Sequence, residues 1–207
     1  MVYFQHNDLI LTRKTYTYVY RYKQQIVRAI YNLLTDLNIR FVISYGNLIE
    51  YERQMPIYHD DDVDVRFSVE DWDKWVEYCQ VPSNINNPKY NLVFDDRFGN
   101  MDAQKYNGIQ ARLIEFENPN NIQTFNTDVH LDLVASVVEL KFWPDFDIDF
   151  NKINRVTYIG SPTFVPNDDD TQRVLTQQYG PNYLIPYPRY AVKFTLDSLN
   201  LDPIRGD

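Results

Sequence analysis

The chain has 207 residues, of which 44% are hydrophobic and 24% charged, a balance typical of a globular protein and not of a disordered one. Its 29 acidic residues outnumber 20 basic ones, and the net charge of −9 argues against nucleic acid or an anionic membrane as a partner. The single cysteine, Cys79, excludes an intramolecular disulfide and a cysteine-built zinc site.

The N-terminal segment predicts an aromatic arm followed by a helix. Tyrosines alternate along 16–22, which is typical of a strand or extended arm with one aromatic face. Such an arm fits a dimer contact, a grip on a glycan or the lead-in to the helix. Ile26, Ile30 and Leu33 recur at spacings of three and four, which predicts a helix over 22–38.

A strand, a glycine turn and a second strand follow. The apolar run 41–45 predicts a buried strand, Gly46 permits a sharp turn, and 47–53 has the pattern of a short helix. Residues 63–67 alternate between apolar and charged side chains, which predicts a strand with two different faces. The spacing of apolar residues from Trp72 onward predicts another helix.

The remainder of the chain interleaves strands and helices. Further strands are expected at 92–94, 110–116, 129–134 and 138–142, and further helices at 170–179 and 188–199. We therefore expect an α+β fold with a mixed sheet flanked by helices. We place a catalytic core in 1–145 and a smaller, partly helical extension packed on it in 146–207. We see neither a signal peptide nor a run of 18 apolar residues, so we expect a cytoplasmic protein without a membrane span.

Two aspartates lie two residues apart in an otherwise apolar strand. Side chains at i and i+2 of a strand share a face, so Asp62 and Asp64 would repel each other unless a cation lies between them. Asp132 lies in a second apolar strand, where an unpaired carboxylate is costly. An acidic run is otherwise typical of a solvated loop. Carboxylates suit Mg²⁺ or Mn²⁺, and a helix start at Gly46 suits a phosphate, so these residues predict a metal and phosphate site.

These segments resemble a known family. The sequences YGNLI at 45–49 and DDDVDV at 60–65, with Arg53 between them, resemble the glycine turn, arginine and Asp-rich signature of the LicD/fukutin branch of the nucleotidyltransferase-fold superfamily. The segment YGPNYLIP at 179–186 is similar to the branch's C-terminal Tyr-Gly…Pro segment. The chain departs from the branch at Asn47, Glu50, Tyr58 and His59, where the branch has Thr, Gly, Pro and Trp.

The resemblance implies a nucleotidyltransferase fold and a role for each matching residue. Asp62, Asp64 and Asp132 would be the catalytic residues and the ligands of Mg²⁺ or Mn²⁺. Gly46 and Asn47 would contact the nucleotide phosphates, while Arg53 would neutralise charge on the phosphodiester. Asp60 matches the first acid of the signature and would shape the site from outside the ligand set.

The same resemblance implies the reaction. The protein would be a metal-dependent transferase that moves a phosphocholine- or phosphoalditol-like group from a CDP-linked donor to a hydroxyl of a sugar or glycan. Asp132, or a second ion, would orient and deprotonate that hydroxyl. One alternative is a nucleotidyltransferase that moves NMP from an NTP to a small molecule or protein. Another is a catalytically inactive binding or structural protein of the same fold.

Other residues with reactive side chains have structural interpretations. The three histidines, His6, His59 and His130, are too scattered for a zinc set. The acids 168–170 precede a predicted helix, where they favour its N-terminal dipole, and Cys79 lies on the apolar stripe of another helix.

Overall fold

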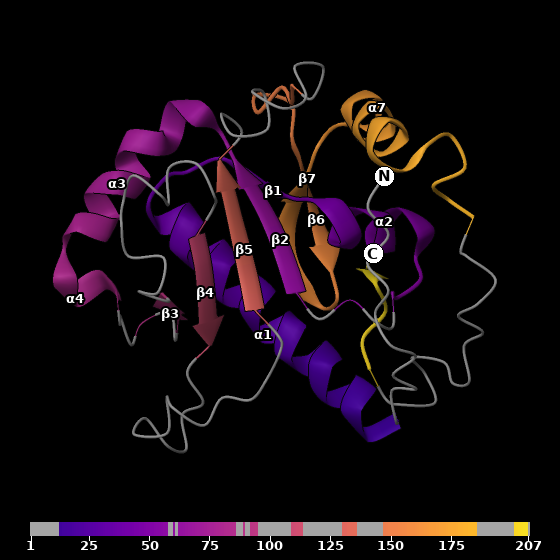
Figure 1. Ribbon diagram of the computed structural model, residues 1–207, viewed down its shortest axis with the longest axis horizontal. Coiled ribbons are helices and arrows are strands. Elements are labelled where there is room, and N and C mark those ends of the chain that lie inside the picture. Colours follow the sequence, from indigo (N-terminus) through magenta and orange to yellow (C-terminus); the bar gives the residue numbers. More distant parts are fainter. Residues whose placement is uncertain are drawn as a thin grey trace.

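The computed structural model describes residues 13–57, 60, 62–85, 89, 92–94, 109–113, 130–135, 147–185 and 201–206. In this part the chain has an α+β fold with two sheets (Figure 1). The larger sheet has the strand order β1 (Phe41–Ile43), β2 (Asp62–Phe67), β5 (His130–Ala135), β4 (Ile109–Leu113) and β3 (Leu92–Phe94). The smaller has the order β7 (Ser161–Val165), β6 (Asn154–Tyr158) and β8 (Arg205–Gly206).

The larger sheet is mixed. Its central pair, β2 and β5, is parallel, whereas β1 with β2, β4 with β5 and β3 with β4 are antiparallel. A parallel pair requires a long crossover. Between β2 and β5 the chain forms the 3₁₀ turn η1 (Val69–Asp71) and the helices α3 (Trp72–Gln80) and α4 (Pro82–Ile85), as well as β3 and β4.

Helix α1 (Arg13–Asp36) crosses one face of the larger sheet (Figure 1). It begins earlier than the periodicity from Ile26 predicts, and the interpretation of 16–22 as a strand or extended arm is wrong. Tyr22 lies four residues before Ile26 and both are buried, so the helical stripe extends backward to Tyr22. The described part of the chain contains no helix that is long and apolar enough to span a membrane.

The hydrophobic core lies between α1, the sheet and the C-terminal part. Its fully buried members include Ile26, Leu33, Leu34, Phe41, Val63, Val65, Trp75, Tyr158 and Leu175. One cluster therefore joins residues on both sides of position 145. The boundary between the two expected domains stays a prediction.

The smaller sheet was not expected from the sequence. Strands β6 and β7 form a hairpin beside β1, closed by Ile159 and Gly160, both with positive φ (44° and 71°) (Figure 1). Two central residues with positive φ are typical of the tight hairpin turn whose twist matches the strands. A bulky residue before glycine, and Pro162 inside β7, weaken the sequence signal for a hairpin.

The remaining elements lie close to their expected positions. Helix α2 (Tyr45–Arg53) follows β1 directly, and α7 (Asp168–Tyr179) begins after Asn167, whose side chain caps it by accepting from the Asp170 N–H at 3.1 Å. The strand expected at 138–142 and the helix expected at 188–199 lie outside the described residues.

Candidate functional site

The two central strands place the predicted acids beside one another. Asp64 is the register partner of Asp132, and Asp62 is the partner of His130. Opposite residues of neighbouring strands are about 5 Å apart, and residues i and i+2 of one strand are about 7 Å apart. Positions 62, 64 and 132 thus share one face of the sheet at spacings that carboxylate side chains can bridge to a common cation.

The two faces of the sheet differ in chemistry. The face of β2 toward α1 is apolar and buried, with Val63, Val65 and Phe67. The alternate positions of β2 carry Asp62, Asp64 and Arg66. Register extends this second face to His130, Asp132 and Gln110. Charged and polar residues thus gather on the face of the central strands that does not pack on α1.

The ligand set itself stays a prediction. The side chains of Asp62, His130 and Asp132 lie outside the described part of the structure, and Asp64 is half-buried. Among the described side chains, no group of three His, Cys, Asp or Glu residues could hold a metal ion. The structure describes the backbone register of β2 and β5, the two strands that carry these acids.

Gly46 lies in the first turn of α2, against the carboxylate of Asp60. A Cβ at Gly46 would lie 2.9 Å and 3.0 Å from the two Asp60 oxygens, too close for any side chain unless Asp60 moved. The left-handed residue of the strand-to-helix turn is Tyr45, with φ of 44°. A glycine at position 46 therefore leaves room for the Asp60 carboxylate. The contact of Gly46 with a nucleotide stays a prediction.

Asn47 is buried with its amide engaged at both ends. Its Oδ1 accepts from the backbone N–H of Asp64 at 2.5 Å, and its Nδ2 donates to Tyr158 at 3.2 Å and to Asp60 at 3.4 Å. The side chain thus links α2 to β2 and to β6. A contact between this amide and a nucleotide, as predicted, would have to compete with these bonds.

Lys23 and Glu50 form a buried charge network with Asp60 that was not identified from the sequence. The Lys23 ammonium lies 2.8 Å from Asp60 Oδ2 and 3.2 Å from Glu50 Oε2. Glu50 also accepts from the Ile57 N–H at 2.7 Å and from the Tyr158 hydroxyl. The available signal was one charged residue inside each apolar helix stripe, at Lys23 and at Glu50.

Burial shifts the titration of this network. It raises the pKa of Glu50, and the nearby Lys23 ammonium opposes that shift. Burial by itself would lower the pKa of Lys23, but Asp60 and Glu50 raise it above its ordinary value. Burial beside Glu50 also raises the pKa of the Tyr158 hydroxyl. At neutral pH Lys23 therefore stays charged and compensates the carboxylates.

Arg53 contacts the segment that follows α7. Its Nε donates to the Tyr183 carbonyl at 2.6 Å, its Nη2 donates to the same oxygen, and the Ile185 carbonyl lies 3.5 Å away. Burial lowers the pKa of the guanidinium. These bonds join two segments that carry the family resemblance, 45–53 and 179–186. The predicted contact of Arg53 with a phosphodiester remains untested.

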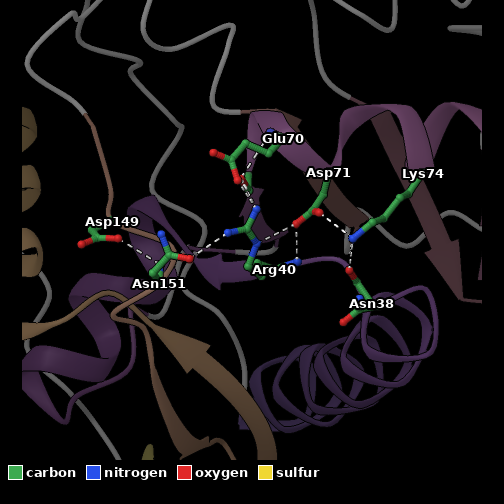
Figure 2. Close-up of polar contacts among 8 residues, drawn as sticks. Asn38, Arg40, Glu70, Asp71, Lys74, Asp149 and Asn151 are labelled. Atoms are coloured by element: carbon green, nitrogen blue, oxygen red, sulfur yellow. Dashed lines mark hydrogen bonds and ion pairs between the residues drawn. The ribbon is translucent and has the colours of Figure 1, made fainter.

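A second polar cluster lies at the other end of the β1–β2 pair (Figure 2). Arg40 bonds Asp71 from its backbone N–H at 2.9 Å and from Nε at 3.1 Å, and also contacts Glu70 and Asn151. Lys74 approaches the other Asp71 oxygen to 2.7 Å. Burial raises the pKa of Asp71, but these donors more than offset that shift and hold it below its ordinary value. No predicted site residue belongs to this cluster.

The sequence was compared with known proteins. No family model matches it, and no curated protein matches it either. The function is therefore inferred from the geometry and from the resemblance of the Asp-rich segment.

Proposed function

We propose that the protein is a metal-dependent transferase of the nucleotidyltransferase fold. It moves a phosphocholine- or phosphoalditol-like group from a CDP-linked donor to a hydroxyl of a sugar or glycan. The observation that supports this is the parallel register of β2 and β5, which sets Asp64 opposite Asp132 and Asp62 two residues away on the same face. The strand-to-helix turn that contains Gly46 begins next to Asp64, because the Ser44 N–H donates to the Asp64 carbonyl at 3.0 Å.

The donor chemistry of the proposed ligands fits Mg²⁺ or Mn²⁺. Three carboxylates on one face would repel one another without a cation, and hard divalent ions prefer oxygen ligands. Such an ion supplies charge stabilisation to the phosphate oxygens of a bound donor. Asp62, Asp64 and Asp132 would hold it.

The residues of the chain would orient the two substrates. As the resemblance implies, the backbone N–H groups of Gly46 and Asn47 in the first turn of α2 would contact the donor phosphates, and Arg53 at the end of the same helix would neutralise charge on the phosphodiester. Asp132 would accept the proton of the acceptor hydroxyl. The hydroxyl oxygen would form a bond to the phosphorus that carries the head group. The bond from that phosphorus to the bridging oxygen would break, and CMP would leave.

The test removes one of the carboxylates that are proposed to bind the metal. We expect Mn²⁺ with CDP-choline or CDP-ribitol to raise the Tm of the wild type, because a ligand of the native state stabilises it. Asp64→Asn keeps the size of the side chain but removes its charge. We expect this variant to lose the Mn²⁺-dependent shift and to lower transfer by more than about 100-fold, since outer-shell partners of metal ligands already contribute about 10- to 100-fold.

The matched control is Asp73→Asn, which changes an exposed acid on α3 and should retain the wild-type shift. Unchanged Mn²⁺ binding in Asp64→Asn would contradict the proposal. Stabilisation by NTPs but not by CDP-linked donors would favour transfer of NMP instead. If no nucleotide stabilises the protein with either metal, the inactive binding or structural role is favoured.

A further inference from the structure

The hydrogen bonding between β1 and β2 ends at Asp64, whose backbone N–H binds a side chain instead of β1. The Ser44 N–H donates to the Asp64 carbonyl at 3.0 Å, as an antiparallel pair requires. The reciprocal bond would run from the Asp64 N–H to the Ser44 carbonyl. That carbonyl instead accepts from Leu48 N–H at 3.2 Å, because α2 has already begun. The Asp64 N–H is bound by the side chain of Asn47 at 2.5 Å.

Asn47 is itself held from two further directions. Its Nδ2 donates to the Tyr158 hydroxyl on β6 and to the Asp60 carboxylate. Lys23 on α1 holds that same Asp60 oxygen at 2.8 Å. The Asn47 side chain is fully buried, so its rotamer is fixed by packing as well as by hydrogen bonds.

We infer that Asn47, fixed by Asp60 and Lys23, is a positioning residue that sets the backbone of Asp64 before the metal binds. The inference rests on the proposed function, in which Asp64 is a ligand. Asn47 completes the sheet at the residue where β1 leaves it, and so aligns Asp64 with Asp132 on β5. Groups that orient a metal ligand from outside the ligand set commonly change the affinity for the metal by about 10- to 100-fold when they are mutated.

The test compares two destabilised variants in their affinity for Mn²⁺. Asn47→Leu keeps a similar volume but removes the bond to the Asp64 N–H. We expect it to raise the Kd for Mn²⁺ by about 10- to 100-fold, measured by calorimetric titration of the full chain. Asp71→Asn changes a buried carboxylate that pairs with Arg40 and Lys74 at the other end of the β1–β2 pair (Figure 2). It should lower Tm while leaving the Kd for Mn²⁺ unchanged.

Each outcome decides the matter. A Kd for Mn²⁺ that is unchanged in a folded Asn47→Leu variant overturns the inference and leaves the proposed function standing. A Kd that rises equally in both variants shows a general effect of stability and also overturns it. Absence of Mn²⁺ binding by the wild type overturns the proposed function and this inference together.

A measurement on the wild type keeps the inference testable if Asn47→Leu does not fold. Amide hydrogen exchange at Asp64 should be slow without metal, because the Asn47 bond already protects that N–H. Adding Mg²⁺ should then change the exchange rate little. Fast exchange at Asp64 that becomes slow only with Mg²⁺ would show that the metal, and not Asn47, orders this residue.

Discussion

Lys23 lies in the interior, where one ammonium meets two carboxylates. Its side chain is only 4% exposed, and it contacts both Glu50 and Asp60. A buried charge is tolerated only when it is paired and hydrogen-bonded. Without Lys23, the two carboxylates would retain neutral donors such as Asn47 and the Tyr158 hydroxyl.

We expect Lys23→Met to lower the free energy of unfolding by about 3–5 kcal/mol at pH 7, because it leaves buried carboxylates without their cation. The raised pKa of Lys23 means that its stabilisation is complete below the ordinary lysine pKa and is lost only as pH rises above it. The raised pKa of Glu50 favours the protonated carboxyl in the folded state. The cost of Lys23→Met should therefore be larger at pH 7 than at pH 4.5. Urea unfolding of the wild type and the variant at pH 7 and at pH 4.5, monitored by circular dichroism, measures this difference.

Lys74→Met is the matched control, because Lys74 also pairs with a carboxylate, that of Asp71, but its side chain is 43% exposed. We expect it to cost no more than about 1 kcal/mol. If both lysine variants cost the same, Lys23 is not compensating buried charge.

The residues that cap the C-termini of α2 and α7 have unusual backbone conformations. Helix α2 ends at Gln54, with φ 52° and ψ 34°, in the left-handed region. Helix α7 ends at Gly180, with φ 84° and ψ 172°, a region that essentially only glycine occupies. A Cβ at Gly180 would have no heavy atom within 4 Å, so substitution there tests backbone strain without a clash.

We expect Gly180→Ala to lower the free energy of unfolding by about 1–3 kcal/mol through backbone strain alone. Gln54→Gly should raise it by about 0.5 kcal/mol, because relief of left-handed strain is partly offset by the larger entropy that glycine loses on folding. Urea titrations of both variants against the wild type measure these changes. A Gly180→Ala variant with an unchanged free energy of unfolding would contradict the backbone conformation at the C-terminus of α7.

At the scale of the whole molecule, the last described segment, 201–206, returns to the first described helix. The Ile159 N–H donates to the Ile204 carbonyl at 2.9 Å, and Ile204 is 2% exposed in the main core. The hydroxyl of Tyr20 on α1 donates to the Asp202 carbonyl at 2.5 Å. The guanidinium of Arg205 lies 4.2 Å from the centre of the Tyr51 ring on α2. The segment 201–206 thus contacts residues on both sides of the expected domain boundary.

We expect Ile204→Ala to lower the free energy of unfolding by about 2–5 kcal/mol and to leave one cooperative transition, because Ile204 packs in the core shared by both parts. Leu184→Ala is the control, since Leu184 is 51% exposed and should change stability by less than about 0.5 kcal/mol. Near- and far-ultraviolet circular dichroism should report coincident midpoints. Two separated transitions would instead favour independent unfolding of 1–145 and 146–207.

The sequence by itself determined the elements whose patterns are local. The spacing of Ile26, Ile30 and Leu33 predicted α1, and the alternation at 63–67 predicted β2 with its two faces. Both succeeded because a helix or strand that packs on one side repeats its apolar residues with its own period. The same two-residue period failed at 16–22, where the backbone is helical and Tyr20 and Tyr22 are buried.

Only the tertiary structure decided which distant residues meet. The pairing of Asp64 with Asp132 spans a crossover of more than 60 residues, whose described part includes α3, α4, β3 and β4, and no local pattern fixes such a register. Likewise Lys23, Asn47, Glu50 and Tyr158 come from two helices, α1 and α2, and from a strand of the smaller sheet. Each is an ordinary polar residue in its own segment, and burial beside the others gives it a role, because charges and amides in the interior must find partners.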